Sequence, residues 1–154
     1  MGSRPGTYAL ILHSDRNIQV RIGRLGVLAL KPGYYLYIGS AFGPGGVRAR
    51  VGRHCGPVKH RHWHIDYLHE HMTPQTVWYS HDSVRHEHCW ADLLAGLDGM
   101  TPVEGFGCSD CRCHSHLFHS TSPPELVSFS RLAGTEIKTR ACRPAQDCAQ
   151  PWSV

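Results

Sequence analysis

The segment that most constrains the fold is Tyr34–Ala41, with the sequence Tyr-Tyr-Leu-Tyr-Ile-Gly-Ser-Ala. Aromatic and β-branched residues dominate it, and such residues suit the pleated surface of a sheet. A Lys-Pro-Gly turn signal precedes it at 31–33, and a glycine-rich loop follows it at 42–46. We therefore expect a strand here, and it is the best-marked strand of the chain.

Other segments show the period of strands or of helices. Alternation of apolar and polar residues, or short β-rich apolar runs, mark further strands, and apolar residues three and four apart mark helices. The predicted strands cover residues 6–12, 18–22, 27–30, 76–79 and 116–119, and the predicted helices cover 47–54 and 86–97. The segments 18–22 and 27–30 are expected to form the two arms of a hairpin.

The length of 154 residues fits one domain with a modest tail. We expect the domain over 1–120 and a C-terminal tail over 121–154, partly ordered at most, because Ser-Pro-Pro and scattered charges follow residue 120. Apolar residues over 126–132 are expected to add at most one edge element. The chain contains no run of 18 apolar residues and no signal-peptide pattern, so we expect a cytoplasmic protein without a membrane span.

Charge is divided unevenly along the chain. Residues 16–65 contain nine Lys or Arg and no acid, whereas residues 66–110 contain eight acids and one Arg. A basic half suits a polyanion, because each neutralised phosphate releases counterions. We expect a nucleic-acid partner, although a solvated charged surface is the simpler alternative. The candidate nucleic-acid contacts are Arg48, Arg53, Lys59 and Arg61.

Two short motifs resemble those that give the GIY-YIG nuclease superfamily its name. They are Gly6-Thr7-Tyr8 and Tyr37-Ile38-Gly39, and the second leads through the glycine loop to a segment rich in Arg that ends at His54. Longer blocks over 33–54, 63–68 and 105–118 resemble one branch, the domain of unknown function 123. Some members of that branch are fused to endonuclease-III-like DNA repair proteins.

The resemblance covers about residues 6–119 and implies an α+β fold. In that fold a small, mostly antiparallel central sheet is flanked by helices, and the hairpin at 18–30 is an addition near the N-terminus. The implied activity is Mg²⁺-dependent endonucleolytic hydrolysis of DNA phosphodiester bonds, with DNA repair as the expected setting. Two alternatives stay open: a catalytically inactive nucleic-acid-binding domain, and a metal- or redox-sensing module.

The resemblance also implies catalytic residues. Tyr8 and Tyr37 are expected to position or deprotonate the nucleophile, and Arg50 to stabilise charge on the phosphoryl oxygens, with Arg48 as the rival assignment. His54 follows Arg50 by one helical turn and is expected to relay a proton. Glu87 is expected to hold Mg²⁺. Tyr8, Tyr37, Arg50 and Glu87 should line one pocket; the alternative is that the tyrosines belong to the core and the charged residues to solvated helix surfaces.

A dense group of soft ligands follows Gly107. The chain has seven cysteines and thirteen histidines, and reduced clustered cysteines favour metal or redox chemistry over disulfides. The spacing Cys-x₂-Cys-x-Cys in one loop differs from the usual two-knuckle zinc pattern. Packing of small thiols in a tight loop is the alternative to Zn²⁺ binding. The candidate soft-metal ligands are Cys108, Cys111, Cys113 and His116.

Overall fold

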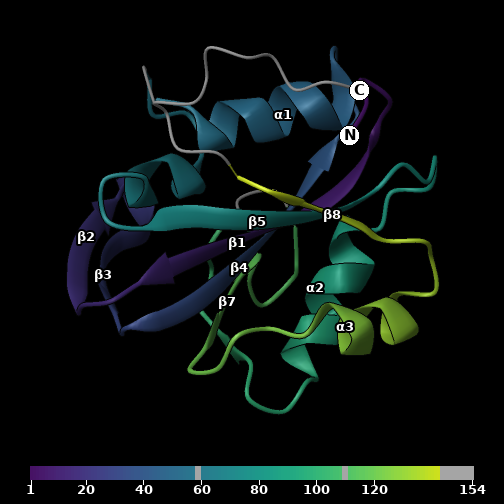
Figure 1. Ribbon diagram of the computed structural model, residues 1–154. Helices are drawn as coiled ribbons and strands as arrows, with labels where there is room; N and C mark the ends of the chain where they lie inside the picture. Colours follow the sequence, from purple (N-terminus) through teal and green to yellow (C-terminus); the bar gives the residue numbers. More distant parts are fainter. Residues whose placement is uncertain (58–59, 109–110, 143–154) are drawn as a thin grey trace.

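The computed structural model describes residues 1–57, 60–108 and 111–142 (Figure 1). Within them, six strands form one antiparallel sheet in the order β6-β7-β4-β1-β5-β8, and β2 and β3 form a separate hairpin. The strands are β1 Gly6–Ser14, β2 Ile18–Ile22, β3 Gly26–Leu30, β4 Gly33–Ala41, β5 Thr73–Ser80, β6 Thr101–Pro102, β7 Leu117–Ser120 and β8 Lys138–Ala141. The helices are α1 Gly46–Cys55, α2 Glu87–Ala95 and α3 Leu126–Ala133, and the 3₁₀ turns are η1 Gly23–Leu25 and η2 His64–Leu68.

This architecture confirms the predicted fold class. The sheet is antiparallel, helices flank it, and β2 and β3 pair as the expected hairpin from Ile18 opposite Leu30 to Ile22 opposite Gly26. None of the helices in the described parts of the chain is long and apolar enough to cross a membrane.

The two faces of the sheet carry two separate apolar clusters, because successive side chains of a strand point to opposite faces. Tyr8 and Leu10 of β1 face α1 and the hairpin, whereas Ala9 and Ile11 face α2 and α3. Figure 1 shows α1 on one side of the sheet and α2 and α3 on the other. Since both faces are covered, β1 is apolar along most of its length instead of alternating.

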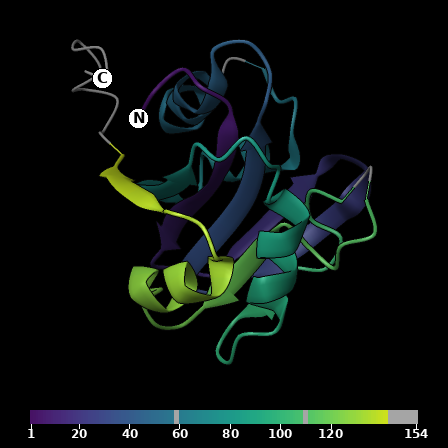
Figure 2. The same cartoon turned by 90° about the vertical axis from the view of Figure 1, so that its right-hand side faces the viewer.

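Residues 121–142 extend the domain past the boundary expected at residue 120. Helix α3 lies beside α2 (Figure 2), and its Phe129 ring packs on Trp78 at 5.4 Å and on Trp90 at 5.2 Å between ring centroids. Strand β8 pairs with β5 at the sheet edge. The sequence signal is weak because α3 has eight residues and β8, Lys-Thr-Arg-Ala, carries two charges. Residues 143–154 of the expected tail lie outside the described residues.

We expect Phe129→Ala to destabilise the domain by about 3–5 kcal/mol, because it leaves a cavity between α3 and the sheet. Denaturant unfolding followed by fluorescence measures this change. Val127→Ala on the same helix is the matched control, since Val127 is 64% exposed and its truncation should cost about 0.5 kcal/mol or less. Equal effects of the two substitutions would mean that α3 is not part of the cooperative core.

Candidate active site

The pairing of β1 with β4 brings the two motif tyrosines onto one face of the sheet. Tyr8 lies opposite Gly39 and Tyr37 lies opposite Leu10, so both rings point toward α1, with 6.5 Å between their centroids. A Cβ atom at Gly39 would overlap the Tyr8 phenol. The glycine of the second motif is therefore needed for the tyrosine of the first to lie across β4.

Helix α1 supplies the next two side chains. His54 and Arg50 lie four residues apart and so share one helix face. His54 is buried, and its Nε2 atom lies 2.7 Å from the Tyr8 hydroxyl. The Arg50 guanidinium lies over the Trp63 ring at 4.3 Å from the centroid. This stacking holds the planar guanidinium in place beside Tyr8, with which it also forms a side-chain hydrogen bond.

Glu87 reaches the site from the other side of the sheet, as the first residue of α2. The Ser40 hydroxyl, at the end of β4, donates to Glu87 Oε2 at 2.5 Å. His116 Nδ1 lies 3.3 Å from Glu87 Oε1. The carboxylate is thus fixed by a partner at each oxygen, and its position at a helix N-terminus favours its negative charge.

One pocket of about 470 Å³ brings these groups together. Tyr8, Tyr37, Arg50 and Glu87 all line it, as expected from the sequence, whereas Arg48 of α1 is not among the lining residues. Sequence reasoning missed Ser40, Trp63 and Arg85, which also line it. Ser40 directly follows the second motif and Arg85 lies two residues before Glu87, so both had a positional signal. Their roles, like those of the predicted residues, stay predictions.

Burial sets the protonation of the tyrosines and the histidine. It raises the pKa of Tyr8 well above its ordinary value, and it raises that of Tyr37 with a further contribution from Glu87. Burial lowers the pKa of His54 to about 3. At neutral pH both phenols are therefore protonated and the imidazole is uncharged, which favours a positioning role for the tyrosines over deprotonation of the nucleophile.

The pKa of Glu87 is decided by two opposing effects. Burial raises it, but the hydrogen bonds from His116 and Ser40, together with the charge of His116, outweigh burial and hold it below its ordinary value. The carboxylate is therefore ionised at neutral pH and suited to a hard cation.

The predicted nucleic-acid contacts are distributed differently. Arg53 donates to the buried Asp66 carboxylate at 2.9 Å and also lies over Trp63, at 3.9 Å from the ring centroid. The exposed Arg61 pairs with Glu70 at 2.9 Å. Arg48 is half-buried on α1, and Lys59 lies outside the described residues. Arg53 is thus committed to the packing of α1 against η2, which reduces its availability to a phosphate.

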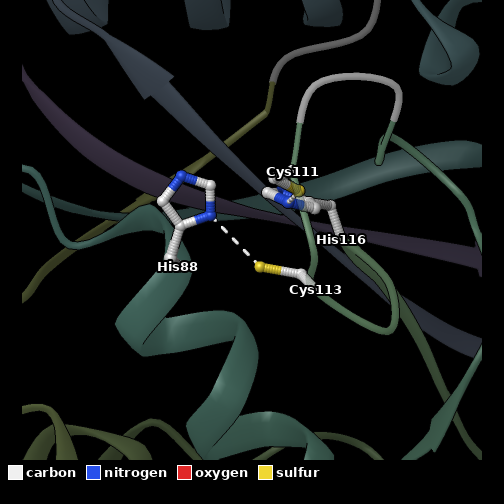
Figure 3. A group of neighbouring side chains, drawn as sticks. All are labelled: His88, Cys111, Cys113 and His116. Carbon is white, nitrogen blue, oxygen red and sulfur yellow. Dashed lines mark hydrogen bonds between the residues drawn. The ribbon is translucent and has the colours of Figure 1, made fainter.

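Two groups of side chains within the described residues could hold a metal ion. One comprises His88, Cys111, Cys113 and His116, whose ligand atoms all lie within 4.8 Å of one another (Figure 3). Three of the four predicted soft ligands belong to it, but His88 from α2 stands in place of Cys108, whose thiol donates to the Phe106 carbonyl at 3.4 Å. The sequence could not indicate His88, because tertiary packing brings α2 to the loop.

The second group comprises His54, Asp66 and His69. Asp66 Oδ2 already accepts hydrogen bonds from the Arg53 guanidinium and from the backbone N–H groups of His62 and Trp63. The cationic guanidinium opposes a second cation at the same oxygen. We therefore describe this group as packing between α1 and η2.

The family model described as a domain of unknown function, DUF123, matches residues 7–139. The chain belongs to this family. No curated protein and no solved structure matches it. The match to the DUF123 domain runs through α3 and into β8, in agreement with the packing of these elements on the sheet.

The lowered pKa of His54 predicts a loss of stability in acid. Because the folded-state pKa of about 3 lies below the ordinary 6.5, the unfolded state binds more protons as the pH falls from 6.5 toward 3. The free energy of unfolding should fall over this window by up to ~1.4 kcal/mol per pH unit. His54→Gln keeps a hydrogen-bonding group beside Tyr8 but cannot titrate.

Urea unfolding of both proteins with a chelator present, at several pH values from 7 to 4, measures this contribution. The difference in unfolding free energy between the two proteins at pH 7 serves as the reference, because it contains the effects of the substitution that do not depend on pH. As the pH falls, the difference should shift in favour of His54→Gln. A difference that stays constant would contradict the lowered pKa.

Proposed function

We propose that this DUF123 domain is a Mg²⁺-dependent endonuclease of the GIY-YIG type that hydrolyses DNA phosphodiester bonds. The observation that carries the proposal is the convergence of Tyr8, Tyr37, Arg50 and Glu87 in one pocket. These residues come from four separate segments, on β1, β4, α1 and α2. Packing alone does not require two phenols, a guanidinium and a carboxylate to share one opening to solvent.

Arginine side chains give the pocket its affinity for phosphate. Arg50 and Arg85 both line it, each beside an aromatic ring: Arg50 over Trp63 and Arg85 over Phe42 at 4.8 Å. Planar guanidinium groups donate two parallel hydrogen bonds to non-bridging phosphate oxygens. In the proposed reaction Arg50 stabilises the charge that grows on these oxygens in the transition state.

The tyrosines orient the attacking water. Tyr8 is held by His54, and its ring is confined above Gly39, so its hydroxyl has one fixed position in the pocket. Tyr37 lies beside it and contacts the His54 ring edge-on at 5.8 Å. The neutral imidazole next to the Tyr8 hydroxyl fixes the orientation of the phenol, and because burial lowers the pKa of His54 to about 3, this role is favoured over uptake of the proton from the water.

The donor set suits Mg²⁺. Among the residues that line the pocket Glu87 is the acidic one, and Mg²⁺ is commonly held by one or two carboxylates together with water and substrate phosphate. Glu87 is the residue that would hold the ion. When bound, the ion lowers the pKa of a coordinated water and polarises a phosphoryl oxygen.

DNA is the proposed substrate because nine basic residues and no acids lie between residues 16 and 65, the segment that carries Arg50. A binding domain without catalysis would share this charge. The proposal of an enzyme is favoured over it by the placement of Glu87, since a carboxylate in a phosphate-binding pocket weakens simple binding.

We expect Arg50→Ala and Glu87→Ala to reduce the rate of cleavage of supercoiled plasmid in Mg²⁺ buffer by at least about 10²-fold, because each removes charge stabilisation at the reacting phosphate. Arg131→Ala is the matched control, because Arg131 is exposed on α3 and does not line the pocket. Full activity in either pocket variant would refute the assignment.

Gel retardation with Glu87→Gln separates an enzyme from a binding domain. Removing the carboxylate charge should leave or improve DNA binding while cleavage is lost. If the wild-type protein retards DNA but never cuts it, the domain is a binding module. If retardation depends on reductant or on zinc chelation, the sensing alternative is favoured.

A further inference from the structure

A second set of side chains meets on the far side of Glu87, where the loop of residues 111–116 approaches the first turn of α2. His88 Nδ1 lies 3.1 Å from Cys113 Sγ, and His116 Nε2 lies 3.2 Å from Cys111 Sγ. Figure 3 shows His88 projecting from α2 toward Cys113, with Cys111 and His116 on the loop side. One cysteine–histidine pair therefore joins α2 to the loop, and the other lies beside it within the loop.

The dimensions of this set suit a tetrahedral ion. Zinc–sulfur bonds of about 2.3 Å and zinc–nitrogen bonds of about 2.0 Å give tetrahedron edges of roughly 3.3–3.8 Å. The two cysteine–histidine separations are slightly shorter than these edges, and no pair among the four ligand atoms exceeds 4.8 Å. Shifts of about an ångström or less in side-chain position close the set around an ion. Two thiolates and two imidazoles are the donors that zinc prefers in structural sites.

We propose that His88, Cys111, Cys113 and His116 form a structural Zn²⁺ site that ties the loop to α2. Binding replaces two thiol S–H bonds by two zinc–sulfur bonds and releases the two protons to solvent, which leaves a neutral Cys₂His₂ centre. The site does not rest on the proposed nuclease activity, because none of its four ligands lines the pocket.

The backbone presents His116 as a prepared ligand. Its carbonyl accepts from the Ile38 N–H at 2.8 Å, and its own N–H donates to the Phe106 carbonyl at 2.8 Å. Phe106 is fully buried and packs edge-on against Tyr37 at 6.2 Å between centroids. The ligand is thereby anchored to β4 and to the core, which lowers the entropic cost of forming the site.

The two ring nitrogens of His116 face different partners. Nδ1 lies 3.3 Å from both Glu87 Oε1 and the Ile38 carbonyl, which are acceptors, whereas Nε2 faces the Cys111 sulfur. The proton therefore belongs on Nδ1, and Nε2 is the atom that binds zinc. A carboxylate that accepts from the second nitrogen of a metal-bound histidine orients the ring and raises its basicity. Glu87 is thus a positioning residue for the zinc site as well as a pocket residue.

The site is tested by loading untagged protein, first stripped with a chelator, with Zn²⁺ and measuring metal and protein after desalting. We expect about one zinc per chain in the wild type and less than about a tenth in His88→Ala and Cys113→Ser. His88 is exposed, so its truncation should leave the fold intact, which circular dichroism checks. Co²⁺ in place of zinc should give the visible absorption of a tetrahedral centre with thiolate ligands.

Cys89→Ser and Cys108→Ser are the matched controls. Cys89 is the neighbour of His88 on α2, and Cys108 lies three residues before Cys111, yet neither belongs to the set. Both variants should load like the wild type. Wild-type protein with less than about a tenth of an equivalent would overturn the proposal. Loss of zinc in Cys108→Ser with retention in His88→Ala would overturn it too, by assigning the ligands to the loop alone.

Glu87→Gln tests the link to the pocket independently of cleavage. Replacement of the carboxylate behind a ligating histidine by a neutral amide should weaken zinc affinity by about 10- to 100-fold, measured by competition with a chelator. Unchanged affinity would overturn the positioning role of Glu87. Because metal content and affinity are measured without DNA, failure of the zinc site and failure of the nuclease proposal are distinguishable.

Discussion

The antiparallel pairing of β1 with β4 is the constraint on which the candidate site depends. It places Tyr8 opposite a residue without a side chain, so the phenol lies across Gly39 and reaches His54 on α1. A shift of β1 by one residue in register would turn Tyr8 toward α2 and α3, onto the face opposite Tyr37. The register is protected because each face of β1 enters its own apolar cluster, and a shift would exchange them.

The start of β1 lies beside the end of β4, and here side chains from the two faces of the sheet come together. Tyr37 and Gly39 point to one face, while the intervening Ile38 and the following Ser40 point to the other. Ser40 therefore meets Glu87, which arrives on α2 from the face opposite α1. A site at this end of the sheet therefore combines a guanidinium from α1 on one face with a carboxylate from α2 on the other face.

Sequence reasoning succeeded where a pattern repeats locally. The hairpin of β2 and β3 was predictable because Ile18, Val20 and Ile22 alternate with polar residues, and the buried and exposed positions of β2 follow that alternation. It failed where structure depends on distant packing. Strand β8 is held at the sheet edge by its backbone pairing with β5. Its sequence therefore needs no apolar pattern, and none marks it as a strand. His88 lies 23 residues before Cys111, and nothing in that interval indicates that α2 returns to the loop.

Glu87 lies between two chemically different environments, and this bears on how the two proposed metals could coexist. Toward the pocket it offers carboxylate oxygen beside hydroxyl groups, the donors that Mg²⁺ prefers, whereas beyond His116 the donors are sulfur and imidazole nitrogen, which zinc prefers. The His116 imidazole separates the two sets, with Nδ1 toward the carboxylate and Nε2 toward the thiol. The hardness of the ligands would then direct each ion to its own site, although the two sites lie close together. A zinc ion on Nε2 would also fix the proton on Nδ1, and so hold the carboxylate in the orientation that the pocket requires.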